Sequence, residues 1–173
     1  MAAAVPSARL LLEASLRDVA AQLGMRTQDL RAAVFALDDD GMLRIVPDLC
    51  QNFSDSREIS IEIRPGEGTA GRAWATAKQH IAVFANVAEE STIGDRRQRE
   101  LVEPELRWIV STPVLDGTGR PMLVLNIDGL REERDVEQLA KSAATLFYWC
   151  GLLAILMGVT SDGLRPTRAA GVA

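Results

Sequence analysis

The stretch Ile63-Arg-Pro-Gly-Glu-Gly-Thr-Ala-Gly-Arg-Ala-Trp-Ala-Thr-Ala-Lys-Gln-His-Ile-Ala-Val-Phe-Ala-Asn86 decides the fold. Its glycines have the Gly-x-Gly-x-x-Gly spacing of a dinucleotide-binding turn, which follows a strand buried on both faces and precedes an acidic residue that binds the ribose. The preceding segment Glu58–Ile63 instead alternates polar and apolar residues, which predicts a half-exposed antiparallel strand. No carboxylate stands at the end of the next strand. The pattern therefore argues against nucleotide binding, and the glycines are expected to allow a tight turn and close helix packing.

Length and composition narrow the class of protein. The chain has 173 residues, a formal net charge of −5 and a pI of about 5.0, which fits one domain with a sizeable core and no basic stripe for nucleic acid. Cys50 and Cys150 do not have metal-ligand spacing, and His80 is the only histidine, so we expect no metal and no cofactor. Two unpaired cysteines and the lack of a secretion signal predict a cytoplasmic protein.

Periodicity and turn residues predict an alternation of helices and strands. Ser7 is a suitable cap for a helix that ends before Gly24. The acidic turn before Gly41 predicts a hairpin between two short strands. The predicted elements are a helix over 8–23, strands over 32–38, 42–46 and 58–63, a helix over 69–78, a strand over 81–84, a charged loop over 88–104, a closing hairpin and a helix over 132–157.

The last predicted helix is apolar on both sides. No charged residue occurs from Ser142 to Ser161, and a helix of that length rises roughly 30 Å, enough to cross a membrane. Three interpretations are open: one face on the sheet and the other on a partner, a tail anchor over 142–161, or burial within one protomer. We expect a homodimer, with the membrane as second choice. The candidate interface residues are Leu146, Trp149, Leu152, Leu153 and Leu156.

Two segments together resemble the GAF domain family. They are the 63–86 stretch and the closing run Trp108-Ile-Val-Ser-Thr-Pro-Val, Asp116-Gly-Thr-Gly and Met122-Leu-Val-Leu-Asn-Ile-Asp128. The resemblance implies an α+β fold, with a central antiparallel sheet of about six strands. The N- and C-terminal helices would cover one face, and short helices and loops the other. It divides the chain into an N-terminal helix (1–30), a core (31–130), an apolar helix (131–160) and a tail (161–173).

The same resemblance implies a sensory or regulatory module that dimerises through its terminal helices and binds a small molecule or a protein. It places a pocket on the sheet face opposite the terminal helices. The candidate lining residues are Phe53, Trp74, His80, Asn86, Trp108 and Thr112. We expect no enzyme, because no nucleophile, base and orienting group can be assembled, and no cysteine lies in the middle of the fold for sulfoxide reduction. The alternatives are a membrane-tethered adaptor and a degenerate scaffold with a filled pocket.

Overall fold

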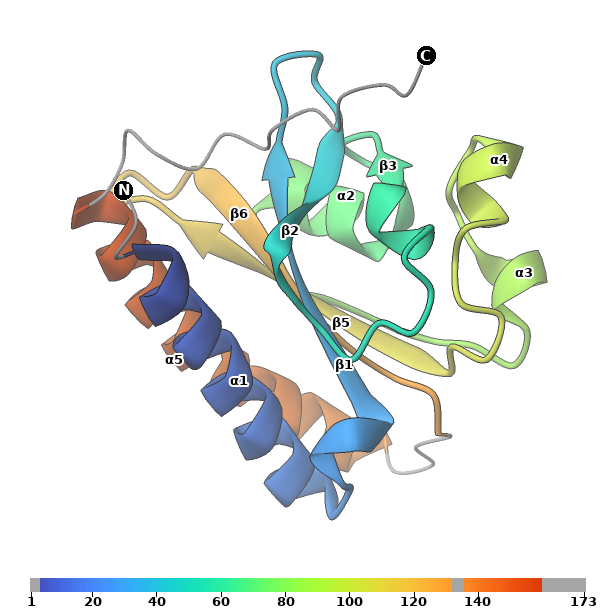
Figure 1. Ribbon diagram of the computed structural model, residues 1–173, viewed down its shortest axis with the longest axis horizontal. Coiled ribbons are helices and arrows are strands. Elements are labelled where there is room, and N and C mark those ends of the chain that lie inside the picture. Colours follow the sequence, from blue (N-terminus) through green and yellow to red (C-terminus); the bar gives the residue numbers. More distant parts are fainter. Residues whose placement is uncertain (1–3, 132–135, 160–173) are drawn as a thin grey trace.

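The computed structural model describes residues 4–131 and 136–159. Its strands form one six-stranded sheet in the order β3-β2-β1-β6-β5-β4, and every neighbouring pair is antiparallel (Figure 1). The predicted α+β class and sheet are therefore confirmed. The elements are α1 (Ala4–Leu23), η1 (Thr27–Asp29), β1 (Leu30–Leu37), β2 (Leu43–Gln51), η2 (Glu58–Ser60), β3 (Glu62–Ile63), α2 (Gly68–Thr76), β4 (His80–Val83), α3 (Val87–Glu90), α4 (Arg96–Arg99), β5 (Trp108–Leu115), β6 (Pro121–Gly129) and α5 (Val136–Val159).

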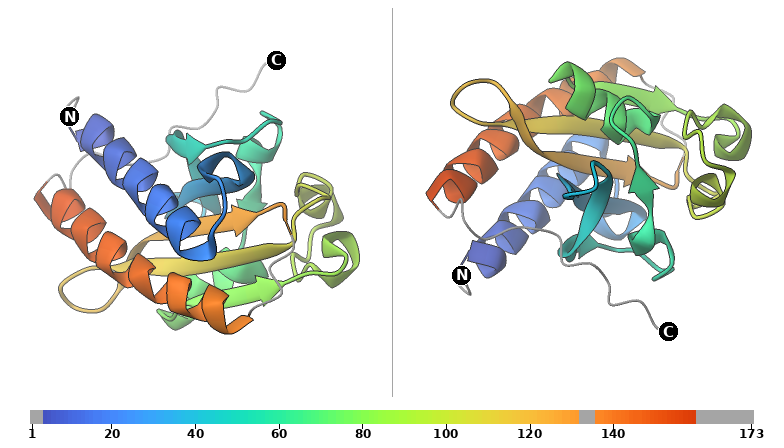
Figure 2. Two further views of the ribbon diagram at one scale, coloured as in Figure 1. Left: turned by 90° about the horizontal axis from the view of Figure 1, so that it is seen from below. Right: turned by 90° about the horizontal axis from the view of Figure 1, so that it is seen from above.

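Helices α1 and α5 lie side by side on one face of the sheet, as both views in Figure 2 show. Their apolar stripes pack on alternate residues of β1, β5 and β6, and this larger core includes Leu12 and Leu16 of α1. Two polar contacts also join the helices: the Trp149 indole donates to Asp18, and the Gln138 amide donates to the carbonyl of Gln22. The predicted helix-covered face is thus confirmed.

The opposite face of the sheet carries α2, η2 and the segment that contains α3 and α4. A second, smaller apolar cluster lies between these elements and the sheet. The strand register sets two cross-strand rows on this face. Arg31 and Ile109 flank Asp128, and one step along, Ala33 and Ser111 flank Asn126. Because side chains alternate between faces, residues one position away from these belong to the helix-covered core.

The glycine turn behaves as its residues predict. Gly66 has φ +93° and Gly68 has φ +56°, a backbone region that side chains rarely adopt. A Cβ on Gly71 would come within 2.3 Å of the Arg64 carbonyl oxygen, so this glycine lets α2 approach the turn closely. The turn therefore lets α2 pack closely against backbone, as the glycine spacing predicted.

The strand predicted over Glu58–Ile63 is wrong in its first half. Glu58–Ser60 forms a 3-10 turn, and only Glu62–Ile63 pairs with β2. The alternating pattern predicted an exposed Glu58, but this residue is 6% exposed and bonded to Arg31. A buried ion pair with β1 outweighed the local strand pattern, because leaving the Arg31 charge buried and unpaired would cost more than a short strand contributes.

Strand β2 is longer than predicted, since it continues through Pro47 to Gln51. Its register against β1 shifts between the Ala33–Cys50 and Phe35–Ile45 pairs, and Pro47 lies in that irregular stretch. A proline cannot donate to a ladder but is tolerated at a bulge. The first helix begins at Ala4, earlier than predicted. The expected start of the last helix at 132 and the tail 161–173 lie outside the described residues.

Candidate functional site

A cavity of about 250 Å³ lies between the sheet and the segments that cover its second face. Residues of β1, β2 and β6 form its floor, and α2 and the segment around α3 form its walls. This volume is slightly below the usual range for ligand pockets, which fits a small molecule. The apolar lining is Ala33, Phe35, Ile45, Phe53, Ile61, Ile63, Ala70, Ala82, Val83, Phe84, Val87, Ile93, Val102, Leu106 and Ile109.

Arg31 is the centre of a buried ionic cluster at one end of the floor. Its Nε donates to Asp128 at 2.7 Å, and its Nη1 and Nη2 donate to the two oxygens of Glu58 at 2.6 and 3.2 Å. The side chain is 3% exposed, and its guanidinium carbon lies 4.6 Å from the centre of the Phe53 ring. Charge-assisted bonds of this kind fix all three side chains in place.

The cluster contains more negative than positive charge. Burial raises the pKa of Glu58 and of Asp128, although the Arg31 guanidinium opposes the shift. With both carboxyl groups ionised, one cation faces two anions in a site with little water. The backbone N–H of Glu103 helps Glu58 by donating to Oε1 at 3.2 Å. Asp128 has no comparable second donor among the described residues, and it also lines the cavity.

Asn126 adds a polar group without a partner to the same floor. It is 4% exposed, and its Oδ1 has no hydrogen-bond partner within the described parts of the chain. The Oγ of the neighbouring Ser111 is likewise unpartnered, but Ser111 does not line the cavity. Buried polar atoms are almost always bonded, so an unbonded amide at a cavity wall is the kind of group that a ligand satisfies.

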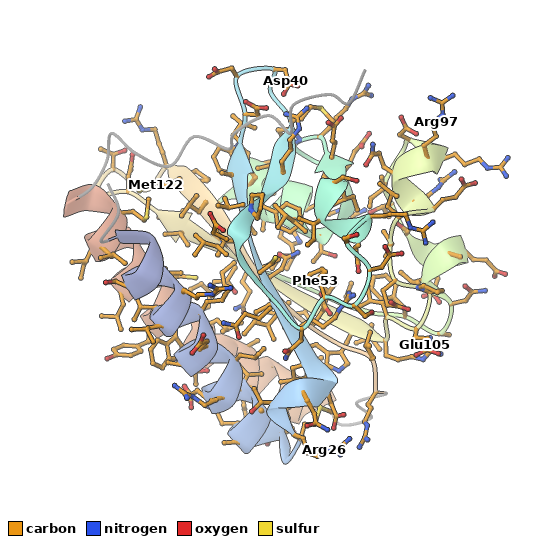
Figure 3. All side chains as sticks on the ribbon, viewed as in Figure 1. Arg26, Asp40, Phe53, Arg97, Glu105 and Met122 are labelled. Atoms are coloured by element: carbon orange, nitrogen blue, oxygen red, sulfur yellow. The ribbon has the colours of Figure 1, made fainter. Side chains whose placement is uncertain are left out.

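Phe53 is the predicted lining residue that does line the cavity. It follows Asn52, which takes φ +62° and donates through Nδ2 to the carbonyls of Thr27 and Leu30. These bonds hold the loop after β2 over the sheet. In Figure 3, Phe53 lies on the side of the sheet away from α1 and α5.

The other five candidates do not line the cavity. Trp108 and Thr112 are fully buried on the helix-covered face, where the Trp108 indole donates to the Arg131 carbonyl. Trp74 packs against the smaller core, His80 contacts the Thr76 hydroxyl, and Asn86 caps α3. Burial and the nearby charges of Arg72 and Lys78 lower the pKa of His80.

The floor residues were missed because they are far apart in sequence. Glu58 and Asp128 lie 27 and 97 positions from Arg31. One signal was present: Arg31 and Asp128 stand at the ends of otherwise apolar strands, where a lone charge needs a partner. The sequence does not show which face of β5 Trp108 occupies, because that depends on how β5 pairs with β6.

The candidate interface residues divide into two groups. Leu146 and Leu153 are at most 1% exposed and belong to the protomer core, so they are not on the surface as predicted. Trp149, Leu152 and Leu156 are partly buried. The exposed apolar side chains of this helix are Phe147, Tyr148 and Ile155, at 53, 65 and 67%. Residues 137–158 are long and apolar enough to span a membrane, with 33% of the most apolar stretch buried in the protomer.

Gln79 connects the cavity side to the helix side. It follows α2, and its Nε2 donates to the Thr112 hydroxyl at 2.8 Å and to the Ala143 carbonyl in α5 at 2.7 Å. Helix α2 itself supplies Gly68, Thr69, Ala70 and Arg72 to the cavity wall. This one side chain therefore joins the segment that follows α2 to α5.

Metal and thiol chemistry find little support in the described residues. Among them, no group of three His, Cys, Asp or Glu side chains is arranged to hold a metal. Burial raises the pKa of Cys150 to about 12, and that of Cys50 above its usual value. Both thiols therefore stay protonated near neutral pH, which makes them poor nucleophiles.

Comparison with solved structures identifies the class of fold. The GAF domain of the nlh2 protein of A. aeolicus, in an inactive state, superposes with a TM-score of 0.58 at 15% identity, covering 88% of this chain and 99% of that one. A GAF sensor protein from Burkholderia vietnamiensis gives 0.55 at 15% identity, covering 94% and 96%. A type II free methionine-R-sulfoxide reductase from Thermoplasma acidophilum gives 0.56 at 16% identity, covering 90% and 96%. The chain has the GAF fold.

Relatives found by sequence have a higher identity to this chain than the solved structures do, but the match covers a smaller part of both proteins. Nif-specific regulatory proteins of Azospirillum lipoferum and Azospirillum brasilense are each 32% identical over 123 residues, which is 70% of this chain and 19% of theirs. The chain thus spans about a fifth of the length of these curated relatives. No protein-family model matches the sequence.

Proposed function

We propose that this GAF domain is a regulatory module that binds a small molecule in the cavity and transmits binding to α1 and α5. The observation that carries the proposal is the buried, unpartnered Oδ1 of Asn126 in the floor of a cavity of about 250 Å³. The names of the sequence relatives, which are regulatory proteins, support the same class of function.

Transmission is proposed to run through α2 and Gln79. A ligand acts only by binding one arrangement of the protein more tightly than another. A ligand against Thr69 or Arg72 contacts α2, and the Gln79 bond then links the end of that helix to the Ala143 carbonyl of α5. The Gln79→Leu variant keeps the size of the side chain and removes this bond.

The test compares a metabolite screen on wild type with the same screen on Ala33→Phe. Ala33 is 2% exposed on the cavity floor, so the larger side chain fills the space a ligand needs. A ligand at about 100 times its Kd stabilises a protein by about 2.7 kcal/mol, which a thermal shift detects. We expect at least one hit that is lost in Ala33→Phe and that changes hydrogen exchange in α5, with the α5 change abolished by Gln79→Leu. Hits that bind Ala33→Phe equally well would contradict a cavity site.

We also propose that the exposed face of α5 is a homodimer interface. Phe147, Tyr148 and Ile155 form an uncharged surface stripe, and a helix that is apolar on both faces needs cover on both. Membrane anchoring is the runner-up, favoured by the length and composition of the helix. Insertion would pull Leu139, Leu146 and Leu153 out of the protomer core, which supports the dimer over the anchor.

Light scattering of protein prepared without detergent separates these alternatives. We expect a dimer that becomes a monomer in Ile155→Glu and stays a dimer in Ile81→Glu. Ile81 is a matched control, because it is a 39% exposed isoleucine that belongs to the edge strand β4 and not to α5. Recovery of the protein only from membranes would support the anchor, and a wild-type monomer in solution would contradict the dimer.

The proposed module is not an enzyme. Both thiols are protonated near neutral pH, and no cysteine of the described residues lines the cavity, which supports this proposal. An assay for reduction of free methionine sulfoxide checks the point. Turnover that is lost in Cys50→Ser would overturn it.

A further inference from the structure

The floor of the cavity offers acceptors and negative charge. The Oδ1 of Asn126 is buried and unbonded, and Asp128 uses one oxygen for its bond to Arg31. The other Asp128 oxygen has no hydrogen-bond partner in the described parts of the chain. These two residues are second neighbours on β6, so their side chains point to the same side of the sheet. A ligand that donates hydrogen bonds satisfies both groups.

The charge of the Arg31 cluster points to the same class of ligand. Glu58 accepts two hydrogen bonds from Arg31 and one from the Glu103 backbone. Asp128 accepts only one hydrogen bond, which comes from the same arginine. One further positive charge beside Asp128 balances the site, and unbalanced buried charge is costly. An anionic ligand would add to the imbalance, since three of the Arg31 donor bonds are already directed at carboxylates.

The rest of the cavity is suited to an apolar body. Phe35, Phe53 and Ile63 line it, and the Phe53 ring already stacks against the Arg31 guanidinium. At the rim, Arg72 and Glu90 are both exposed and carry opposite charges, so the rim favours neither sign. The polar end and the apolar walls together define an amphipathic site with its charge at the bottom.

We propose that the cavity binds a small organic cation, an amine with an aromatic or branched apolar body, whose ammonium group donates to Asp128 and Asn126. This inference rests on the proposed function, because it assigns the ligand class of the same cavity. An ammonium group has three donors, and these two acceptors take two of them. The aromatic ring of Phe53 lies along the apolar part of the ligand.

Three probes of similar size test the charge preference: 2-phenylethylamine, 2-phenylethanol and 3-phenylpropionate. Their affinities are measured at neutral pH by chemical-shift titration of the full chain. We expect the amine to bind at least about tenfold tighter than the alcohol, a ratio worth about 1.4 kcal/mol. The acid is expected to bind most weakly.

Variants of floor residues locate the preference. In Asp128→Asn, the amine-to-alcohol ratio is expected to fall close to one, while binding of the alcohol shows that the variant is folded. In Asn126→Leu, the amine is expected to lose at least about fivefold in affinity through one charge-assisted hydrogen bond. Ser111→Ala is the matched control, because it removes a buried unpartnered oxygen that does not line the cavity, and its ratio is expected to be that of wild type.

The outcomes separate this inference from the proposed function. If the acid or the alcohol binds as tightly as the amine, the cavity is a ligand site but the cation assignment is wrong. If an amine preference persists in both Asp128→Asn and Asn126→Leu, the amine binds elsewhere and the assignment is again wrong. If no probe of any charge binds, the cation assignment is wrong, whereas the proposed function falls only if the metabolite screen also gives no ligand that is lost in Ala33→Phe.

Discussion

Replacing Arg31 by methionine tests whether the buried ionic cluster organises the second face of the sheet. Methionine has a similar length and no charge, so the change leaves Glu58 and Asp128 without a counter-ion. Both carboxyl side chains are at most 7% exposed, and three hydrogen bonds of 2.6–3.2 Å are lost. Removal of one partner from a buried ion pair costs about 3–5 kcal/mol. We therefore expect Arg31→Met to lose about 3–5 kcal/mol of unfolding free energy.

Urea denaturation followed by circular dichroism measures the change. For a chain of this length, 1 kcal/mol corresponds to about 2–4 °C in Tm, so the expected loss is also visible as a Tm lowered by roughly 6–20 °C. Arg57→Met is the matched control, because Arg57 forms a similar pair with Asp55 but is 81% exposed. We expect the control to be indistinguishable from wild type, as exposed pairs contribute little.

Repeating the urea denaturation at lower pH distinguishes a loss of charge balance from a loss of packing. As pH falls, Glu58 and Asp128 take up protons, and a neutral pair no longer needs Arg31. The deficit of Arg31→Met is therefore expected to shrink as pH falls through the raised pKa values of these two carboxyl groups. A loss no greater than that of Arg57→Met, or a deficit independent of pH, would refute the electrostatic reasoning.

Three further predictions concern single positions. Asn126→Leu is expected to raise the unfolding free energy of the ligand-free protein by about 1–2 kcal/mol, since it removes an unsatisfied buried oxygen; a loss of stability in urea would show that the amide is bonded in solution. Gly129→Ala is expected to lower Tm strongly, because a Cβ there would lie 2.4 Å from the Trp108 ring, whereas Gly117→Ala, with open space around it, is expected to change little; equal Tm values would contradict the close contact. Burial raises the pKa of Asp128 above its unfolded value, so its contribution to stability is present at low pH and is lost as pH rises through the folded-state pKa. The stability of wild type relative to Asp128→Asn is therefore expected to fall as pH rises through the raised pKa of Asp128, and a rise measured by urea titration would contradict this sign.

The local features of the fold could be predicted because they depend on short-range physics. The glycines of the 63–86 stretch require particular φ angles and close approach, and helix α5 shows its apolar character in any window. The α+β arrangement and the helix-covered face followed from these elements and from the GAF resemblance. Each of these predictions uses residues that are neighbours in the chain or on one helix face.

The position of each candidate site residue relative to the cavity depends on pairing between distant strands, which the sequence alone does not show. Phe53 lines the cavity, but Trp108 and Thr112 lie on the opposite face of β5 by a single residue of register, since Ile109 and Ser111 face the other way. Glu58 was assigned to an exposed strand face because its partner, Arg31, is recognisable only once β1 and β6 are paired. Strand parity and long-range ion pairs require the assembled sheet.

The three tryptophans of the chain lie in three different layers of the molecule. Trp74 packs in the core beside the cavity, Trp108 is fully buried between the sheet and the helices, and Trp149 lies on α5 with its indole bonded to Asp18. Each indole therefore sits in a different environment. In variants that keep one tryptophan at a time, the fluorescence intensity would report separately on a ligand-induced change beside the cavity, in the interior or at the helix pair. No attached dye is needed.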